Sequence, residues 1–275
     1  MTMLSVLLAV AATLPLRDFA LKSLAERLSK YAPTNSLARF VNYPNGAARG
    51  KFTPNPNFWL SDVDFSSVSP WNSGGGALRA GTAISKRHVI FAQHFPLWKG
   101  VRILFVGKDG GVCPCYIDKT KGIPSSDIMV ASLDSELTPN IVPAKILPRN
   151  FAEHVGGCGG FPVVTFNRQE KAYLTFLNGM VKEYTGQRHG LCHKSDNPEW
   201  AKFREDIVVG DSGNPAFVLI GNQPILVYCL QGGGCGMGSA IHSRSREIQA
   251  AMDELCPGYK LEEFDFSQVK MKSEK

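Results

Sequence analysis

Most of the chain consists of short apolar runs separated by glycine-rich turns. The runs recur about every ten residues, and clusters such as SGGG, GKDGG, GGCGG and GGGCGMG lie between them. Runs of this length bounded by turn residues are typical of β-strands. The sequence therefore predicts an all-β barrel or sandwich. We expect strands within residues 82–93, 101–107, 113–118, 127–134, 144–148, 161–166, 171–185, 205–210, 215–221 and 223–231.

Helical spacing occurs near the two ends of the chain. Residues 239–255 carry apolar side chains along one side and are followed by Cys-Pro-Gly, which predicts a C-terminal helix that stops there. A second helix is predicted over residues 17–30. Its apolar positions are Phe19, Leu21, Leu24 and Leu28.

These patterns divide the chain into five parts. A polar stretch rich in Pro, Asn and Gly follows the first helix, which predicts a linker or pro-segment before the main β body. The region around residues 140–160 is the expected boundary between two β units. The parts are a signal-peptide candidate at 1–16, a helical linker or pro-segment at 17–50, β units at 51–150 and 151–256 (the second with the C-terminal helix), and a polar tail at 257–275.

The apolar N-terminus has two interpretations. The run from Met3 to Leu16 is too short to span a bilayer as a helix, but it resembles a signal-peptide core, with Ala9 and Ala11 at the spacing of a cleavage site. No basic residue precedes it, however, and the alternative interpretation is that it begins the amphipathic helix. On the first interpretation the protein is secreted or periplasmic.

The charge and the cysteine content limit which partners and cofactors the sequence predicts. The net charge of +6 is spread along the chain without a basic stripe interleaved with aromatics, which argues against nucleic acid as a partner. Seven cysteines leave one unpaired if the others form disulfides. Zinc ligands could be drawn from Cys113 and Cys115, or from His189, Cys192 and His193, but paired C-x-x-C knuckles are absent. We expect core cysteines with two disulfides, and neither a metal nor an organic cofactor.

Three segments carry the residue types of nucleophilic catalysis. Ser212 lies in a tight Gly-Asp-Ser-Gly turn, which could aim backbone N–H groups at one point. His94 follows an apolar run, and Asp127 directly precedes another. A serine hydroxyl needs a base to accept its proton and a third group to orient that base. The sequence therefore predicts a site in the order His, Asp, Ser.

The same segments resemble those of the trypsin- and chymotrypsin-like serine peptidases, particularly bacterial members. GDSGNP is similar to the family's serine motif G-D-S-G-G-P, HVIFAQHF to its histidine segment, and SSDIMVASL to its aspartate segment. The resemblance covers roughly residues 50–256 and keeps the family's order. It implies two antiparallel six-stranded Greek-key barrels with a C-terminal helix, here with an N-terminal helical extension.

The resemblance also implies roles for individual residues. Ser212 would be the nucleophile, His94 the general base and then acid, and Asp127 the carboxylate that fixes the imidazole tautomer. The N–H groups of Gly210 and Ser212 would form the oxyanion hole. Asp206 lies where trypsin-like enzymes carry the aspartate of the primary specificity pocket, which implies cleavage after Arg or Lys. The chain is then expected to be a monomeric endopeptidase acting on proteins or peptides.

Departures from the family's pattern keep an alternative open. Asn214 replaces a glycine, and we expect it to tolerate a left-handed backbone there. Phe95 and Val208 stand where animal enzymes place cysteines. No Ile-Val-Gly-Gly segment precedes the first β unit, so the amine that normally pairs with the aspartate before the serine, here Asp211, has no visible counterpart. The alternative is a catalytically inactive relative that uses this fold to bind proteins.

Overall fold

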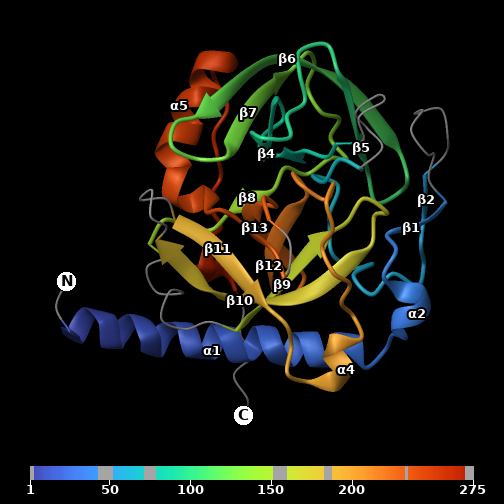
Figure 1. Cartoon of the computed structure of the whole chain (residues 1–275), viewed down its shortest axis with the longest axis vertical. Coiled ribbons are helices and arrows are strands. Elements are labelled where there is room, and N and C mark those ends of the chain that lie inside the picture. The colour runs from blue at the N-terminus through green and yellow to red at the C-terminus, as the bar shows by residue number, and fades with distance from the viewer. Residues whose placement is uncertain are drawn as a thin grey trace.

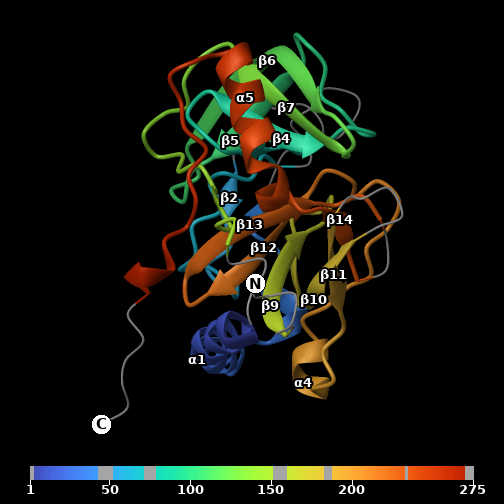
Figure 2. The same cartoon turned by 90° about the vertical axis from the view of Figure 1, so that its left-hand side faces the viewer.

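The computed structural model describes residues 3–42, 52–70, 79–150, 160–182, 188–232 and 235–269, with the side chains of residues 3–15, 179–191 and 268 outside the description. The described strands form two large curved sheets that lie one above the other in Figure 2. One has five strands and the other has seven. The chain is thus mostly β, with antiparallel curled sheets and a C-terminal helix.

The five-stranded sheet comes from the first half of the chain, in the order β3-β4-β7-β6-β5, and every pairing is antiparallel. Its strands are β3 (Thr82–Ala83), β4 (His88–Ala92), β5 (Arg102–Val106), β6 (Val112–Ile123) and β7 (Ile128–Leu133). β4 and β7 are buried along their whole length, which explains their continuous apolar runs.

The seven-stranded sheet has the order β14-β11-β10-β9-β12-β13-β8, and only β8 joins it in parallel. Its strands are β8 (Lys145–Ile146), β9 (Phe161–Phe166), β10 (Ala172–Lys182), β11 (Arg188–His193), β12 (Pro215–Ile220), β13 (Gln223–Cys229) and β14 (Met237–Ser239). A small separate sheet pairs β1 (Phe40–Asn42) with β2 (Thr53–Pro54).

The C-terminal helix α5 (Ser245–Leu255) packs on β6 and β7 of the first sheet, although it follows the last strand of the second. A short 3-10 helix, η2 (Ile241–Arg244), leads into it. Buried His88 of β4 holds α5 in place: its Nε2 donates to the Met252 carbonyl oxygen at 3.1 Å, and its Nδ1 accepts from the Ser85 hydroxyl at 2.8 Å. The Nε2–H is present in the neutral and the protonated ring, whereas acceptance at Nδ1 requires the neutral imidazole.

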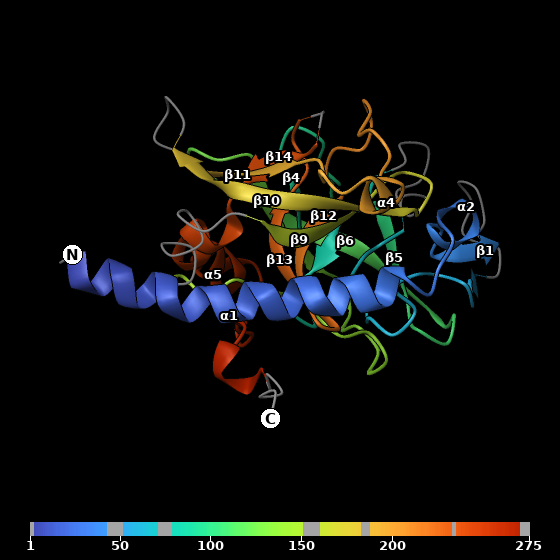
Figure 3. The same ribbon diagram turned by 90° about the horizontal axis from the view of Figure 1, so that it is seen from below.

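The N-terminal helix α1 (Met3–Leu28) runs along the second sheet and contacts β9 and β12 (Figures 1 and 3). Its side chains Leu16, Ala20, Leu24 and Leu28 are buried against that sheet's core. The predicted boundary at residue 16 therefore falls inside one continuous helix. Among the described residues, no helix combines the length and the apolar composition needed to cross a membrane.

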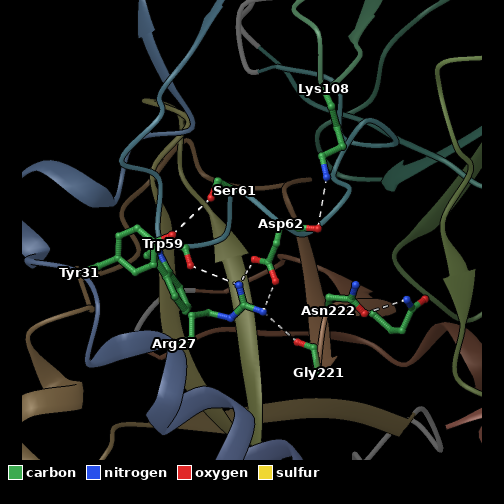
Figure 4. Close-up of polar contacts among 9 residues, drawn as sticks. Arg27, Tyr31, Trp59, Ser61, Asp62, Lys108, Gly221 and Asn222 are labelled. Atoms are coloured by element: carbon green, nitrogen blue, oxygen red, sulfur yellow. Dashed lines mark hydrogen bonds and ion pairs between the residues drawn. The ribbon is translucent and has the colours of Figure 1, made fainter. Parts of the chain in front are cut away.

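A polar clamp fixes the C-terminal end of α1 (Figure 4). The buried guanidinium of Arg27 binds both carboxylate oxygens of Asp62, with Nη2 at 2.8 Å from Oδ2. The same guanidinium donates to the carbonyl oxygens of Trp59 at 3.5 Å and Gly221 at 3.3 Å. Burial alone would raise the pKa of Asp62, but the bonds and charge of Arg27 lower it below its ordinary value. Helix, loop and the β12–β13 turn are thereby joined at one cation.

Shorter helical pieces complete the described chain. They are α2 (Pro33–Ser36), α4 (Pro198–Ala201) and the 3-10 helix η3 (Phe266–Gln268).

Nine of the ten predicted strand segments contain a strand, and residues 205–210 do not. That stretch forms a loop, because its apolar Val208 and Val209 point to solvent, Val209 being 98% exposed. The C-terminal helix begins later than predicted, because residues 237–239 pair with β11 as β14. The five-plus-seven division differs from six plus six, so the two six-stranded barrels stay a prediction.

The neutral state of His88 makes stability depend on pH. Burial lowers its pKa from 6.5 to about 4, partly offset by the bond to Met252. Below pH 6.5 His88 becomes protonated in the unfolded chain, whereas in the folded chain it stays neutral down to about pH 4. The stability that neutral His88 contributes is therefore present above this window and is lost as the pH falls through it. In urea denaturation, the advantage of wild type over His88→Gln should shrink by about 3 kcal/mol between pH 7 and pH 4. A constant difference would contradict this.

The Arg27 clamp should contribute measurably to stability. Arg27→Met keeps the apolar stem but removes all four hydrogen bonds, so we expect a loss of about 1.5–3 kcal/mol, the range for hydrogen bonds to charged groups. Arg27→Lys keeps the charge but not the bidentate geometry, so its stability should lie between those of wild type and Arg27→Met. Urea midpoints at a common slope provide the measurement, and equal midpoints for wild type and Arg27→Met would refute the clamp.

Candidate active site

His94 and Asp127 form a direct pair at the ends of neighbouring strands. His94 follows the end of β4 and Asp127 precedes the start of β7, and β4 pairs with β7 in the first sheet. Nδ1 of His94 lies 2.5 Å from Oδ2 of Asp127, and the His94 backbone N–H donates to Oδ1 at 2.7 Å. Because a carboxylate only accepts, Nδ1 carries the proton and Nε2 is left as a base.

Two residues of the second sheet hold Asp127. The hydroxyl oxygen of Ser239 accepts the Asp127 backbone N–H at 3.2 Å. The amide of Gln231 donates to that same hydroxyl at 2.7 Å and to the Asp127 carbonyl oxygen at 3.4 Å. Neither residue was predicted as part of the site. Gln231 lies in the loop after β13 and Ser239 ends β14, each next to a glycine, and the sequence carries no signal of their partner.

The serine turn has left-handed backbone at Gly210 and Gly213, with φ angles of 101° and 86°. These positions require glycine. Asn214 is not among the residues with positive φ, so the turn does not use the tolerance for a left-handed backbone that was expected of it. Its fully buried side chain instead donates from Nδ2 to the Asp211 carbonyl oxygen at 3.0 Å. The asparagine therefore ties the turn together.

The serine turn packs against the strand that leads to His94. A Cβ placed on Gly213 would lie 3.4 Å from the Ala80 carbonyl oxygen and 3.9 Å from the nitrogen of Ala92, the last residue of β4. The partly exposed Ser212 thus comes from the second sheet to the His94 end of the first. Within the described chain, no hydrogen bond joins the Ser212 hydroxyl to His94.

Two backbone donors of the turn are unused. The N–H groups of Asp211, Gly213 and Asn214 donate to the carbonyl oxygens of Val208, Leu230 and Asp211. Those of Gly210 and Ser212 donate to no group in the described part of the chain. These are the two donors that the resemblance assigns to an oxyanion hole. An anion bound at this turn would therefore find both groups available.

Asp211 is fully buried beside the nucleophile candidate, and its carboxylate is held from within the chain. Oδ2 accepts the N–H of Val208 at 2.9 Å and Oδ1 accepts that of Arg168 at 3.1 Å. Burial raises the pKa of this carboxyl, while both hydrogen bonds and the nearby Arg168 charge act in the opposite direction. The partner of Asp211, which the sequence left open, is the turn between β9 and β10.

Asp206 lies at the surface. Its side chain is 74% exposed and pairs with Arg204 at 2.5 Å. The floor of a specificity pocket for basic side chains needs a buried carboxylate that is free to meet them. Around it the loop presents Val208 and Val209 to solvent, which makes this edge of the site apolar.

The described cysteines are all free thiols, so the two expected disulfides are not present among them. They are Cys113, Cys115, Cys192, Cys229, Cys235 and Cys256, while Cys158 lies outside the described residues. Free thiols give no sign of an oxidising compartment, and export stays a prediction. In the described ranges, no three His, Cys, Asp or Glu side chains gather as metal ligands.

No protein-family model matches the chain, and no curated protein matches it significantly.

Proposed function

We propose that this protein is a serine-type endopeptidase that hydrolyses peptide bonds through an acyl-enzyme. The observation that carries the proposal is the pairing of His94 with Asp127 beside a serine turn that retains two unused N–H donors. A surface histidine–aspartate pair alone is common. Here the pair lies at the end of the strand against which the serine turn of the second sheet packs. Ser212 in that turn is partly exposed, and this combination favours catalysis.

Each residue has one role in the proposed reaction. The Ser212 hydroxyl attacks the peptide carbonyl carbon while Nε2 of His94 takes its proton. Asp127 holds the imidazole in this tautomer and stabilises its positive charge. The oxyanion is bound by the N–H groups of Gly210 and Ser212, each worth about 3 kcal/mol in such sites. His94 then protonates the leaving amine, and water attacks the acyl-enzyme by the same route.

The missing Ser212–His94 hydrogen bond favours the second candidate function, a catalytically inactive protein-binding module. Catalytic hydrogen bonds are frequently long without substrate and tighten in the complex. The unused donors at Gly210 and Ser212 suit an oxyanion hole, which a binding module without catalysis does not require. We therefore place the endopeptidase first.

The finer architecture belongs to the same proposal. A pair of six-stranded Greek-key barrels would place the histidine and aspartate on one barrel and the serine on the other. If β8, which joins the second sheet in parallel from the connecting segment, is counted apart, the second sheet has the six strands of such a barrel, while the first sheet has five.

A fluorophosphonate probe tests the activity directly. It should label the wild-type protein at Ser212 and leave Ser212→Ala unlabelled. His94→Ala should lower the labelling rate by several orders of magnitude, because the serine loses its base. Mass spectrometry of the labelled peptide identifies the residue. Thermal melts of all three proteins should nearly coincide, because neither side chain is buried in a core. An unlabelled but folded wild type would support the binding module instead.

Cleavage after Arg or Lys through Asp206 is not part of this proposal, because that carboxylate is exposed and paired with Arg204. Peptide-library profiling of wild type and Asp206→Asn should therefore give the same preference before the cut. Loss of a basic preference in the variant would restore Asp206 to the role that the resemblance implied.

A further inference from the structure

The buried carboxylate of Asp211 decides the shape of the serine turn, since it lies next to Ser212 and both its oxygens are engaged. We propose that the β9–β10 turn, residues 167–171, is a built-in positioning element that orders this turn without a freed N-terminal amine. Arg168 is its key positioning residue, through its backbone N–H. The inference rests on the proposed function.

The turn is shaped to present that N–H. The Glu170 N–H donates to the Asn167 carbonyl oxygen at 2.9 Å, which closes a four-residue β-turn with Arg168 at its second position. The buried Asn167 side chain accepts the N–H groups of Gln169 at 2.9 Å and Lys171 at 3.1 Å. These bonds occupy the other donors of the turn. The Arg168 N–H is the one directed at Asp211.

A buried ion pair between Glu170 and Arg39 holds the β9–β10 turn in place. Glu170 is fully buried, has a φ of 55°, and lies 3.7 Å from the guanidinium of Arg39. Arg39 is itself buried and donates to the carbonyl oxygens of Val68 at 3.2 Å and Val106 at 3.0 Å. A left-handed glutamate with a buried charge is expensive to fold. Its presence here is explained if the turn must be held in one conformation.

A second link joins the turn to the loop that carries the nucleophile. Glu205 accepts from Nδ2 of Asn167 at 3.2 Å and from Nζ of Lys171 at 2.6 Å. Glu205 begins the segment that runs through Val208 to Asp211. The β9–β10 turn is therefore bonded to this loop at two residues, Glu205 and Asp211. In the trypsin-like scheme a mobile amine makes the corresponding contact only after cleavage. Here every contact is internal.

Two substitutions at one position separate the backbone donor from the side chain. Arg168→Pro removes the N–H that binds Asp211 together with the arginine side chain, and it suits the second position of a β-turn, where proline is favoured. Arg168→Ala keeps the N–H and removes the cation. We expect the fluorophosphonate labelling rate to fall roughly tenfold to a hundredfold in Arg168→Pro, the effect of losing a hydrogen bond to a buried charge. Arg168→Ala should stay near wild type.

A structural role alone is excluded by dividing the rate by the folded fraction from circular dichroism. With a peptide substrate, Arg168→Pro should lower kcat and leave KM unchanged, because the oxyanion hole acts in the transition state. An uncleaved N-terminal fusion should label as fast as the unfused chain. Equal labelling of wild type and both variants, or activity only after removal of the fusion, would overturn this inference alone. Absence of labelling in every protein would overturn the proposed function together with it.

Discussion

The buried carboxylate of Asp211 constrains the candidate site more than any other group. A charge out of contact with water must be matched by donors, and here they are the N–H groups of Val208 and Arg168. Satisfying it fixes the turn at Ser212, leaves two N–H groups unused, and ties the second sheet's β9–β10 turn to the segment that carries Ser212. The rest of the site is then a question of bringing this turn to the His94 end of the first sheet.

The parts of the fold that were predictable are those where burial dictates a pattern. Four strands are buried along their whole length, and their continuous apolar runs made them predictable. They are β4, β7, β9 and β12. The stop of α5 at Cys256 followed from the residues after it. β11 was missed because Arg, His and Gly interrupt it, and its strand character comes from pairing with β10 and β14. Val208 and Val209 were misread for the opposite reason: they are apolar but exposed.

For the site, local motifs located His94, Asp127 and Ser212 but not their supports. Ser239 acts through its hydroxyl, Gln231 through its side-chain amide and Arg168 through its backbone N–H. Such contacts leave no residue pattern in the chain. Asn214 was understood only in part, because its value lies in a side-chain bond to the Asp211 carbonyl and not in its own φ angle. The role suggested for Asp206 depended on burial, which sequence position cannot supply.

We propose that Ser212 forms a covalent intermediate with substrate. Mass spectrometry of the protein, quenched with acid during turnover of a peptide ester, tests it most directly. We expect an acyl adduct on the peptide that contains Ser212, which accumulates in wild type and is missing in Ser212→Ala. Turnover without an adduct, or an adduct on another residue, would contradict it.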